Sequence, residues 1–191
     1  MNKSRLEAFS DGVIAILITI MVLELKVPGG GDLAALIPLL PVILSYILSF
    51  VFLGIYWNNH HHLFQAVKQV NGAVLWANLH LLFWLSLVPF VTAWMGKNAS
   101  SPWPVALYGI VLFAAGFAYF ILTKALVSLH GQDSELAAIL TQNTKEMASI
   151  VLYALAIPLA FVSSWISDGL YVLVAILWLI PDTRIERRLI K

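Results

Sequence analysis

Cysteine is absent from the chain, and charged side chains are scarce. Without cysteine the protein has no disulfide, no thiolate-ligated metal and no iron–sulfur cluster. Asp, Glu, Lys and Arg make up 11% of the 191 residues, whereas soluble domains average about 25%. Eleven basic against ten acidic residues leave a net charge of +1, which argues against a nucleic-acid surface or an acidic tail. These shortages exclude an ordinary soluble protein.

Apolar residues make up 61% of the chain and fall in long runs. A membrane-spanning helix needs about 20 mainly apolar residues, because each residue rises about 1.5 Å through a hydrocarbon core about 30 Å thick. The sequence therefore predicts an all-α integral membrane protein in which residues 1–191 form one six-span domain, with no soluble part to carry enzyme chemistry. The expected spans are residues 12–27, 33–57, 70–95, 105–129, 147–165 and 169–180.

Proline marks several features of these spans. Pro38 and Pro41 fall in the opening turns of the second span, where proline is tolerated. Pro158 lies inside the fifth span and predicts a kink there.

The distribution of basic residues predicts the orientation, because positive loops near span ends stay in the cytoplasm. With the N-terminus inside, the outer side holds only Lys26 and Lys97. We therefore expect both termini to be cytoplasmic and the first span to be retained. The inner side then holds Lys3, Arg5, Lys68, Lys124, Lys145, Arg184, Arg187, Arg188 and Lys191.

Polar groups at membrane depth are costly unless they are paired or face water, so such residues are informative. In the run from Arg5 to Asp11, helical spacing places Glu7 and Asp11 on one face, one turn apart. One interpretation is an interfacial helix start, capped by Ser10 or Asp11 with Arg5 extended toward water. The other is a buried polar network at the cytoplasmic end of a pore helix.

Two further polar clusters contain histidine. His60, His61 and His62 close the second span, and Asn78 and His80 lie inside the third. Consecutive histidines point around a helix in 100° steps, so a three-imidazole metal site is not expected from this run. Pairing of these imidazoles with carboxylates near Asp11 is more economical. A haem held between His60 and His80 is an alternative, and structural hydrogen bonding is the default role for the third span.

The first span carries a periodic stripe. Gly12, Ile16, Thr19, Leu23 and Lys26 recur every three or four residues and share one helix face. Such a stripe is typical of a packing seam between helices, or it lines a path for ions. In the second case Glu24, only partly offset by Lys26, would attract cations to the outer mouth.

The segment Arg5-Leu-Glu-Ala-Phe9-Ser10-Asp11 resembles the R-x-x-x-F-S-D signature that opens the transmembrane protein 175 family of potassium channels. Trp57-x-x-His60-x-x-Leu63-Phe64 is similar to the family segment after the second span. Asn78 and Pro89, eleven residues apart, are similar to its third span.

The resemblance implies a potassium-preferring cation channel in a bacterial-type inner membrane. Bacterial members assemble as homotetramers, and the first helix of each six-span subunit lines the central pore. The family's constriction lies five, eight and twelve residues after the signature aspartate, which implies Ile16, Thr19 and Leu23 here. A ring of Ile16 side chains would gate by dewetting, and Thr19 hydroxyls would ligate partly dehydrated potassium. No cofactor and no tightly bound structural metal are implied.

The signature residues are then expected to support the pore helix. Arg5, Ser10 and Asp11 would form a network with His60 and with Asn78 or His80, and Phe9 completes the signature. Removing one partner from such a buried network costs several kcal/mol. The implied partners are other copies of the chain, the lipid bilayer and monovalent cations, with no nucleic acid.

Two other classes of protein remain as alternatives. A proton-coupled secondary transporter or proton-permeable channel would use Glu7, Asp11, His60 and His80 as relay groups. Against a transporter, the halves show no internal repeat: the Phe9-Ser10-Asp11 run has no counterpart near Leu107. A membrane enzyme or haem protein is the third class.

Overall fold

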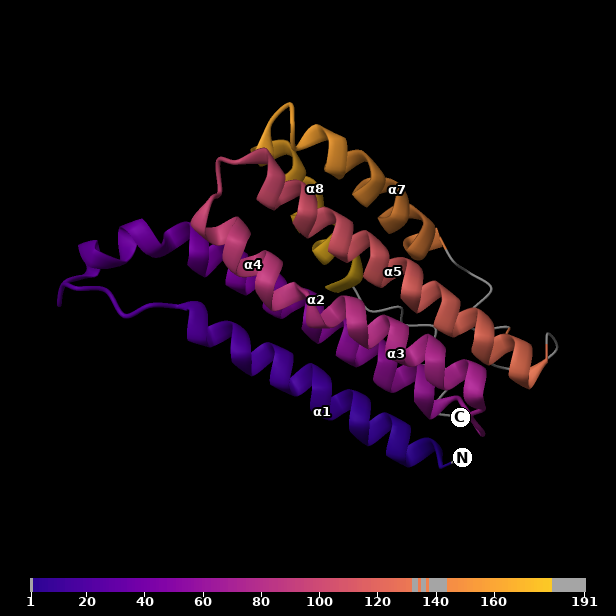
Figure 1. Ribbon diagram of the computed structural model, residues 1–191. Coiled ribbons are helices and arrows are strands. Elements are labelled where there is room, and N and C mark those ends of the chain that lie inside the picture. The colour runs from indigo at the N-terminus through magenta and orange to yellow at the C-terminus, as the bar shows by residue number, and fades with distance from the viewer. Residues whose placement is uncertain (1, 132–133, 135–136, 138–143, 180–191) are drawn as a thin grey trace.

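The computed structural model describes residues 2–131, 134, 137 and 144–179, and all elements in these ranges are helical. Figure 1 shows them as an elongated bundle with α1 along one flank and α7 on the opposite one. In chain order they are α1 (Lys3–Met21), the short 3-10 helices η1 (Val22–Glu24) and η2 (Leu33–Leu39), α2 (Leu40–Gln65), α3 (Gly72–Ser86), α4 (Val88–Lys97), α5 (Pro102–His130), α7 (Thr144–Leu159) and α8 (Ser164–Leu179).

Four helical segments are long and apolar enough to cross a membrane by length and composition. They are Lys3–Glu24, Leu33–Gln65, Gly72–Lys97 and Pro102–His130, and Ser164–Leu179 is a shorter apolar helix. With α7, and with α3 and α4 taken as one interrupted span, the described residues hold one helical segment for each of the six expected spans. The protein is therefore an all-helical, multi-pass membrane protein.

The first helix begins well before the predicted start at Gly12. Asn2 caps it at Lys3, because the Asn2 side chain accepts a hydrogen bond of 2.9 Å from the Ser4 backbone N–H. The expectation that Ser10 or Asp11 caps the helix is wrong. Both residues lie inside α1, so the whole signature segment is helical.

The third span is interrupted, which the sequence analysis did not predict. The interruption lies at Leu87, between α3 and α4, two residues before Pro89. Proline has no backbone N–H, and its ring hinders the carbonyl four residues earlier. The segment therefore breaks into two helices at this point.

The fifth span is shorter than the predicted residues 147–165. Helix α7 ends at Leu159, one residue after Pro158, so this proline lies in the last turn and not at a mid-helix kink. A turn follows, and α8 begins at Ser164. Residue 180, the predicted end of the sixth span, lies outside the described residues.

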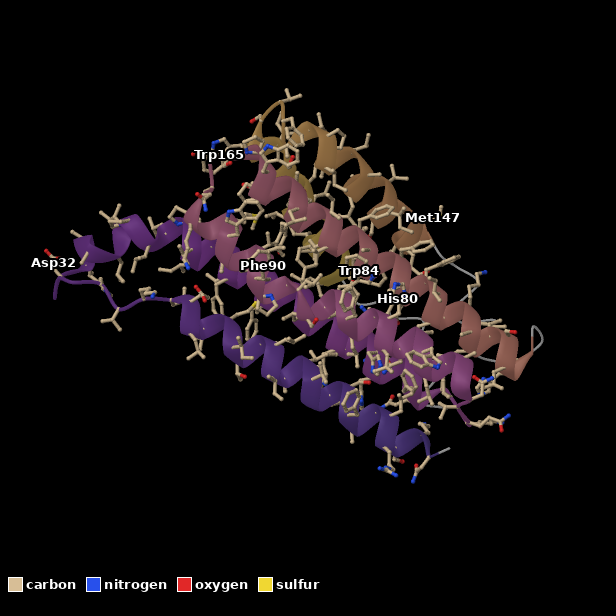
Figure 2. The ribbon with its side chains drawn as sticks, in the orientation of Figure 1. Asp32, His80, Trp84, Phe90, Met147 and Trp165 are labelled. Atoms are coloured by element: carbon tan, nitrogen blue, oxygen red, sulfur yellow. The ribbon has the colours of Figure 1, made fainter. Side chains whose placement is uncertain are left out.

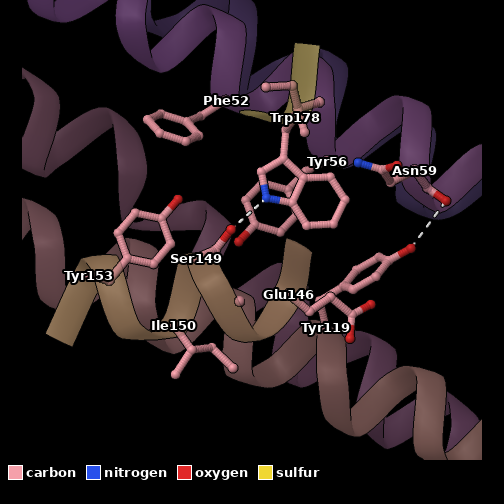
Figure 3. A pocket seen from close by; sticks show the side chains of 11 residues that line it. Phe52, Tyr56, Asn59, Tyr119, Glu146, Ser149, Ile150, Tyr153 and Trp178 are labelled. Carbon is pink, nitrogen blue, oxygen red and sulfur yellow. Dashed lines mark hydrogen bonds between the residues drawn. The ribbon is translucent and has the colours of Figure 1, made fainter. Parts of the chain in front are cut away.

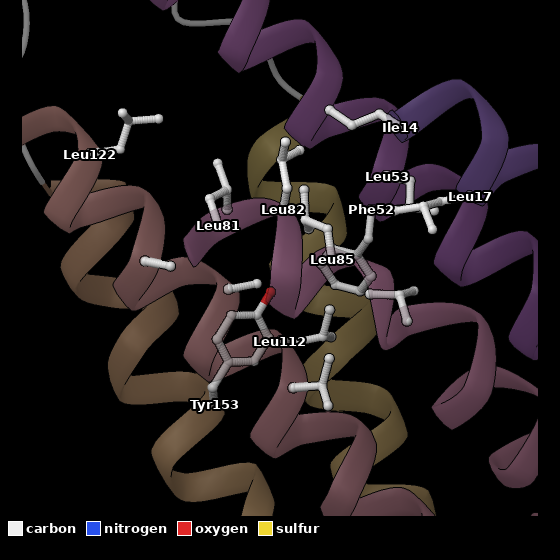
Figure 4. Packing of buried hydrophobic residues seen from close by; sticks show 14 of the residues in the cluster. Ile14, Leu17, Phe52, Leu53, Leu81, Leu82, Leu85, Leu112, Leu122 and Tyr153 are labelled. Carbon is white, nitrogen blue, oxygen red and sulfur yellow. The ribbon is translucent and has the colours of Figure 1, made fainter. Parts of the chain in front are cut away.

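The core lies where α5 packs between α3 and α7. Buried leucines such as Leu81, Leu85 and Leu112 fill it, as Figure 4 shows. Helix α1 packs against α2, α3 and α4 and contributes Ile14 and Leu17 to the same core. One face of α1 is thus packed against the rest of the chain.

Candidate functional site

The opposite face of α1 carries Gly12, Ile16 and Thr19 of the predicted stripe, Leu23 follows in η1, and these residues are uncovered. Ile16 is 57% exposed and Leu23 is 76% exposed, whereas Ile14 is fully buried. Thr19 and Gly12 are exposed as well. Apolar side chains on a helix of this length are uncovered in one chain only if lipid, another subunit or a pore meets them.

Thr19 is the one hydroxyl residue inside this stripe. Its Oγ1 lies 2.9 Å from the Ile16 carbonyl oxygen and 3.1 Å from that of Ala15. The hydroxyl hydrogen is therefore donated to the helix backbone, as serine and threonine commonly do inside membrane helices. The oxygen lone pairs remain available on the exposed side.

Three buried polar residues join α1, α2 and α3 beneath the stripe. His60 Nε2 lies 2.8 Å from Asn78 Oδ1, and Asn78 Nδ2 donates to Ser10 Oγ at 2.9 Å. Ser10 in turn donates to the Leu6 carbonyl at 2.9 Å. Ser10, His60 and Asn78 are all fully buried. These hydrogen bonds pair His60 Nε2, the Asn78 amide and Ser10 Oγ and fix α1 against its neighbours, whereas His60 Nδ1 is buried without a hydrogen-bond partner among the described residues.

In the described part of the chain, the other residues predicted for this network form no hydrogen bond with it. Arg5 and Phe9 are exposed on α1, so a single chain does not bring them into the network. Asp11 Oδ1 is buried without a hydrogen-bond partner among the described residues. His80 accepts a hydrogen bond of 2.9 Å from Trp84 Nε1 one turn along α3, and Figure 2 shows these two side chains together.

The neighbouring histidine meets a carboxylate. His61 Nδ1 lies 3.5 Å from Glu7 Oε1, which joins the end of α2 to the start of α1. Among the described residues no group of three or more His, Asp or Glu side chains is placed to hold a metal ion. Both haem-ligand candidates, His60 and His80, have side-chain hydrogen-bond partners within the protein.

At the other end of α1, Glu24 has a closer partner than Lys26. Lys97 of α4 donates to Glu24 Oε2 at 2.7 Å in a solvent-exposed ion pair. The expected cation-attracting charge of Glu24 is therefore balanced mainly by Lys97. This pair also ties η1, which directly follows α1, to α4.

Comparison of the sequence with known proteins identifies the family of this chain. The family described as "Endosomal/lysosomal potassium channel TMEM175" matches residues 5–89. A potassium channel of Chryseobacterium sp. (strain P1-3) is 56% identical over 189 residues, covering 99% of this chain and 98% of that protein. The chain belongs to the TMEM175 family.

A solved structure and an animal relative support the same family assignment. The crystal structure of a lysosomal potassium-selective channel TMEM175 homolog from Chamaesiphon Minutus matches with a TM-score of 0.81 at 32% identity, covering 93% of this chain and 96% of that one. The endosomal/lysosomal proton channel TMEM175 of Rattus norvegicus is 29% identical, and the match covers 86% of this chain but 36% of the rat protein. The TMEM175 fold is thus shared along nearly the whole chain.

Proposed function

We propose that this protein is the subunit of a homotetrameric, potassium-preferring cation channel and that the exposed face of α1 lines its central pore. The observation that carries the proposal is the uncovered stripe of Ile16 and Thr19 on α1 and Leu23 on the adjoining η1, while the opposite face of α1 is packed in its own subunit. Bacterial relatives named potassium channels support the choice of ion.

Four copies around one axis place four Ile16 and four Leu23 side chains in rings. Closed symmetry is the usual outcome for identical subunits. An apolar ring narrow enough to exclude water stops ions, because an ion in a dry neck loses its hydration without replacement ligands. We therefore assign Ile16 as the gate of the pore. Leu23 forms a second apolar ring nearer the outer side of the membrane.

Thr19 is assigned the selectivity of the pathway. It lies one turn from Ile16, and its hydroxyl hydrogen is donated to the helix backbone. The oxygen lone pairs of four Thr19 residues then offer weak ligands to a partly dehydrated cation near Ile16. Potassium gives up its water more easily than sodium, so weak ligands favour potassium modestly.

The proposed setting is a bacterial inner membrane with both termini in the cytoplasm, which the excess of Lys and Arg on the side of the N-terminus supports. The ion pair between Glu24 and Lys97 then lies at the outer end. The pathway is passive, needs no cofactor beyond the permeant ion and involves no enzyme activity.

Reversal-potential measurements on the purified protein in a planar bilayer test this proposal. With potassium on one side and sodium on the other, we expect discrete current steps that reverse toward the potassium equilibrium potential. Flux that is seen only under a pH gradient, or that saturates without current steps, would reject the channel in favour of a proton-coupled transporter.

Proton conduction is a second candidate, because animal relatives are named endosomal/lysosomal proton channels. Repeating the bilayer measurement with a pH gradient and symmetric potassium separates the two ions. A reversal potential that stays at zero assigns the current to potassium, and one that follows the pH gradient assigns it to protons.

A further inference from the structure

A cavity of about 40 Å³ lies in the half of the subunit away from α1, between α2, α5, α7 and α8. Figure 3 shows the side chains around it. No residue of α1 lines it, so this site is separate from the proposed pore.

Aromatic residues are the largest group among those that line the cavity. Phe52 and Tyr153 are nearly fully buried, and the other rings come from α2, α5 and α8. The faces of such rings carry partial negative charge and attract organic cations. The aromatic lining consists of Phe52, Tyr56, Tyr119, Tyr153 and Trp178.

Several polar groups of the lining are paired within the protein. Trp178 Nε1 donates to Ser149 Oγ at 2.7 Å, and Ser149 donates to the Lys145 carbonyl at 2.8 Å. Tyr119 donates to the Asn59 carbonyl at 3.3 Å, as the dashed line in Figure 3 shows. These side chains therefore serve as wall and support for the cavity.

Glu146 is an ionisable group of the lining that is not paired in this way. Its Oε2 is closed off from solvent and has no hydrogen-bond partner among the described residues. The nearby ammonium of Lys124 lies over the Phe120 ring, 5.3 Å from its centroid, and the described part of the chain shows no ion pair between Lys124 and Glu146. A buried carboxylate oxygen without a donor is costly, so it favours a ligand that brings one.

We propose that this cavity binds a small primary alkylammonium ion. The ammonium group donates to Glu146 Oε2, and the alkyl chain lies among the aromatic rings. A primary ammonium supplies the hydrogen-bond donors that a quaternary ammonium lacks, and the apolar walls favour an alkylated cation over a hydrated metal ion. The site thus differs from the α1 face in both ligand and position.

Saturation-transfer NMR on the full chain in detergent, with n-butylammonium chloride as the probe, tests the proposal. We expect saturable binding that weakens at least about tenfold in Glu146→Gln, because a hydrogen bond to a charged group is lost. n-Butanol has the same chain without the charge and is expected to bind the wild-type protein much more weakly. Asp32→Asn removes an exposed loop carboxylate and is expected to bind like wild type.

A second variant tests the cavity itself. A Cβ atom added at Gly116 would meet nothing closer than the Tyr56 hydroxyl at 3.8 Å, so Gly116→Leu fills the cavity from a tolerant position. We expect it to abolish butylammonium binding, whereas Thr19→Ala on the α1 face leaves binding unchanged. Absence of saturable binding to the wild type, equal binding in Glu146→Gln, or loss of binding in Thr19→Ala would overturn the proposal.

Discussion

At the scale of single residues, the account depends on one hydroxyl in an apolar stripe. Thr19 is exposed between Ile16 and Leu23, and its hydrogen is held by the backbone. In the proposed pore, an oxygen in this position replaces part of a potassium ion's water but is too weak a ligand to do so for sodium, which holds its water more tightly.

Replacing Thr19 with alanine is therefore expected to lower the potassium-to-sodium permeability ratio severalfold while leaving a conducting pore. Reversal potentials under opposed potassium and sodium gradients measure the ratio. Thr19→Ser keeps the hydroxyl and is expected to retain most of the selectivity. An unchanged ratio in Thr19→Ala would show that the selectivity does not come from this ring.

Single residues also show which features of the site can be predicted from the sequence alone. The stripe of Ile16, Thr19 and Leu23 was predictable, because helical period and apolarity are local properties, and its exposure agrees with a face left free by the subunit. The partners of Asn78 were not predictable. Spacing indicates that a buried amide needs partners, but which of the surrounding polar groups it meets depends on how three helices pack.

At the scale of helices, Asn78 joins α1, α2 and α3 by bonding both Ser10 and His60. Asn78→Ala leaves the buried His60 ring without a hydrogen-bond partner, at a cost of about 1–3 kcal/mol, and removes the hydrogen bond that Ser10 Oγ accepts, although Ser10 still donates to the Leu6 carbonyl. We expect a clear fall in unfolding temperature, followed by intrinsic tryptophan fluorescence in detergent. Asn58→Ala, an exposed position on α2, serves as the matched control, and equal unfolding temperatures in the two variants would contradict this role.

The sequence predicts which segments form helices, but it does not predict where those helices begin and end. Long apolar runs indicate spans because hydrocarbon thickness sets their length. The start of α1 was missed because its first turns carry Lys3, Arg5 and Glu7, which look interfacial, although Asn2 caps them into one continuous helix. The break at Leu87 and the end of α7 after Pro158 depend on how proline is accommodated, which hydropathy does not report.

The aromatic cavity was missed for a related reason. Its walls come from α2, α5 and the consecutive helices α7 and α8, and aromatic residues in spans usually indicate core or lipid contact. Glu146 stands next to an apolar run. A carboxylate at that position was the available signal, but only packing shows that one of its oxygens is enclosed without a donor.

At the scale of the whole molecule, Asp11 is expected to matter for assembly more than for conduction. Its Oδ1 is buried without a partner among the described residues of one chain, and Arg5 is exposed on the same helix. Asp11→Ala is therefore expected to reduce the yield of tetramer in size-exclusion chromatography with light scattering. A normal tetramer yield with an altered current would assign Asp11 to the conduction path instead.

The central claim is that the exposed face of α1 lines the pore, and the absence of cysteine allows a direct test. Leu23→Cys introduces the only thiol of the chain at an exposed position in η1, which directly follows α1, and Ile14→Cys introduces one on the buried face of α1. The measurement is potassium current before and after a positively charged methanethiosulfonate reagent is added from the outer side. The account predicts loss of current in Leu23→Cys and none in Ile14→Cys. Full current in modified Leu23→Cys protein would contradict it.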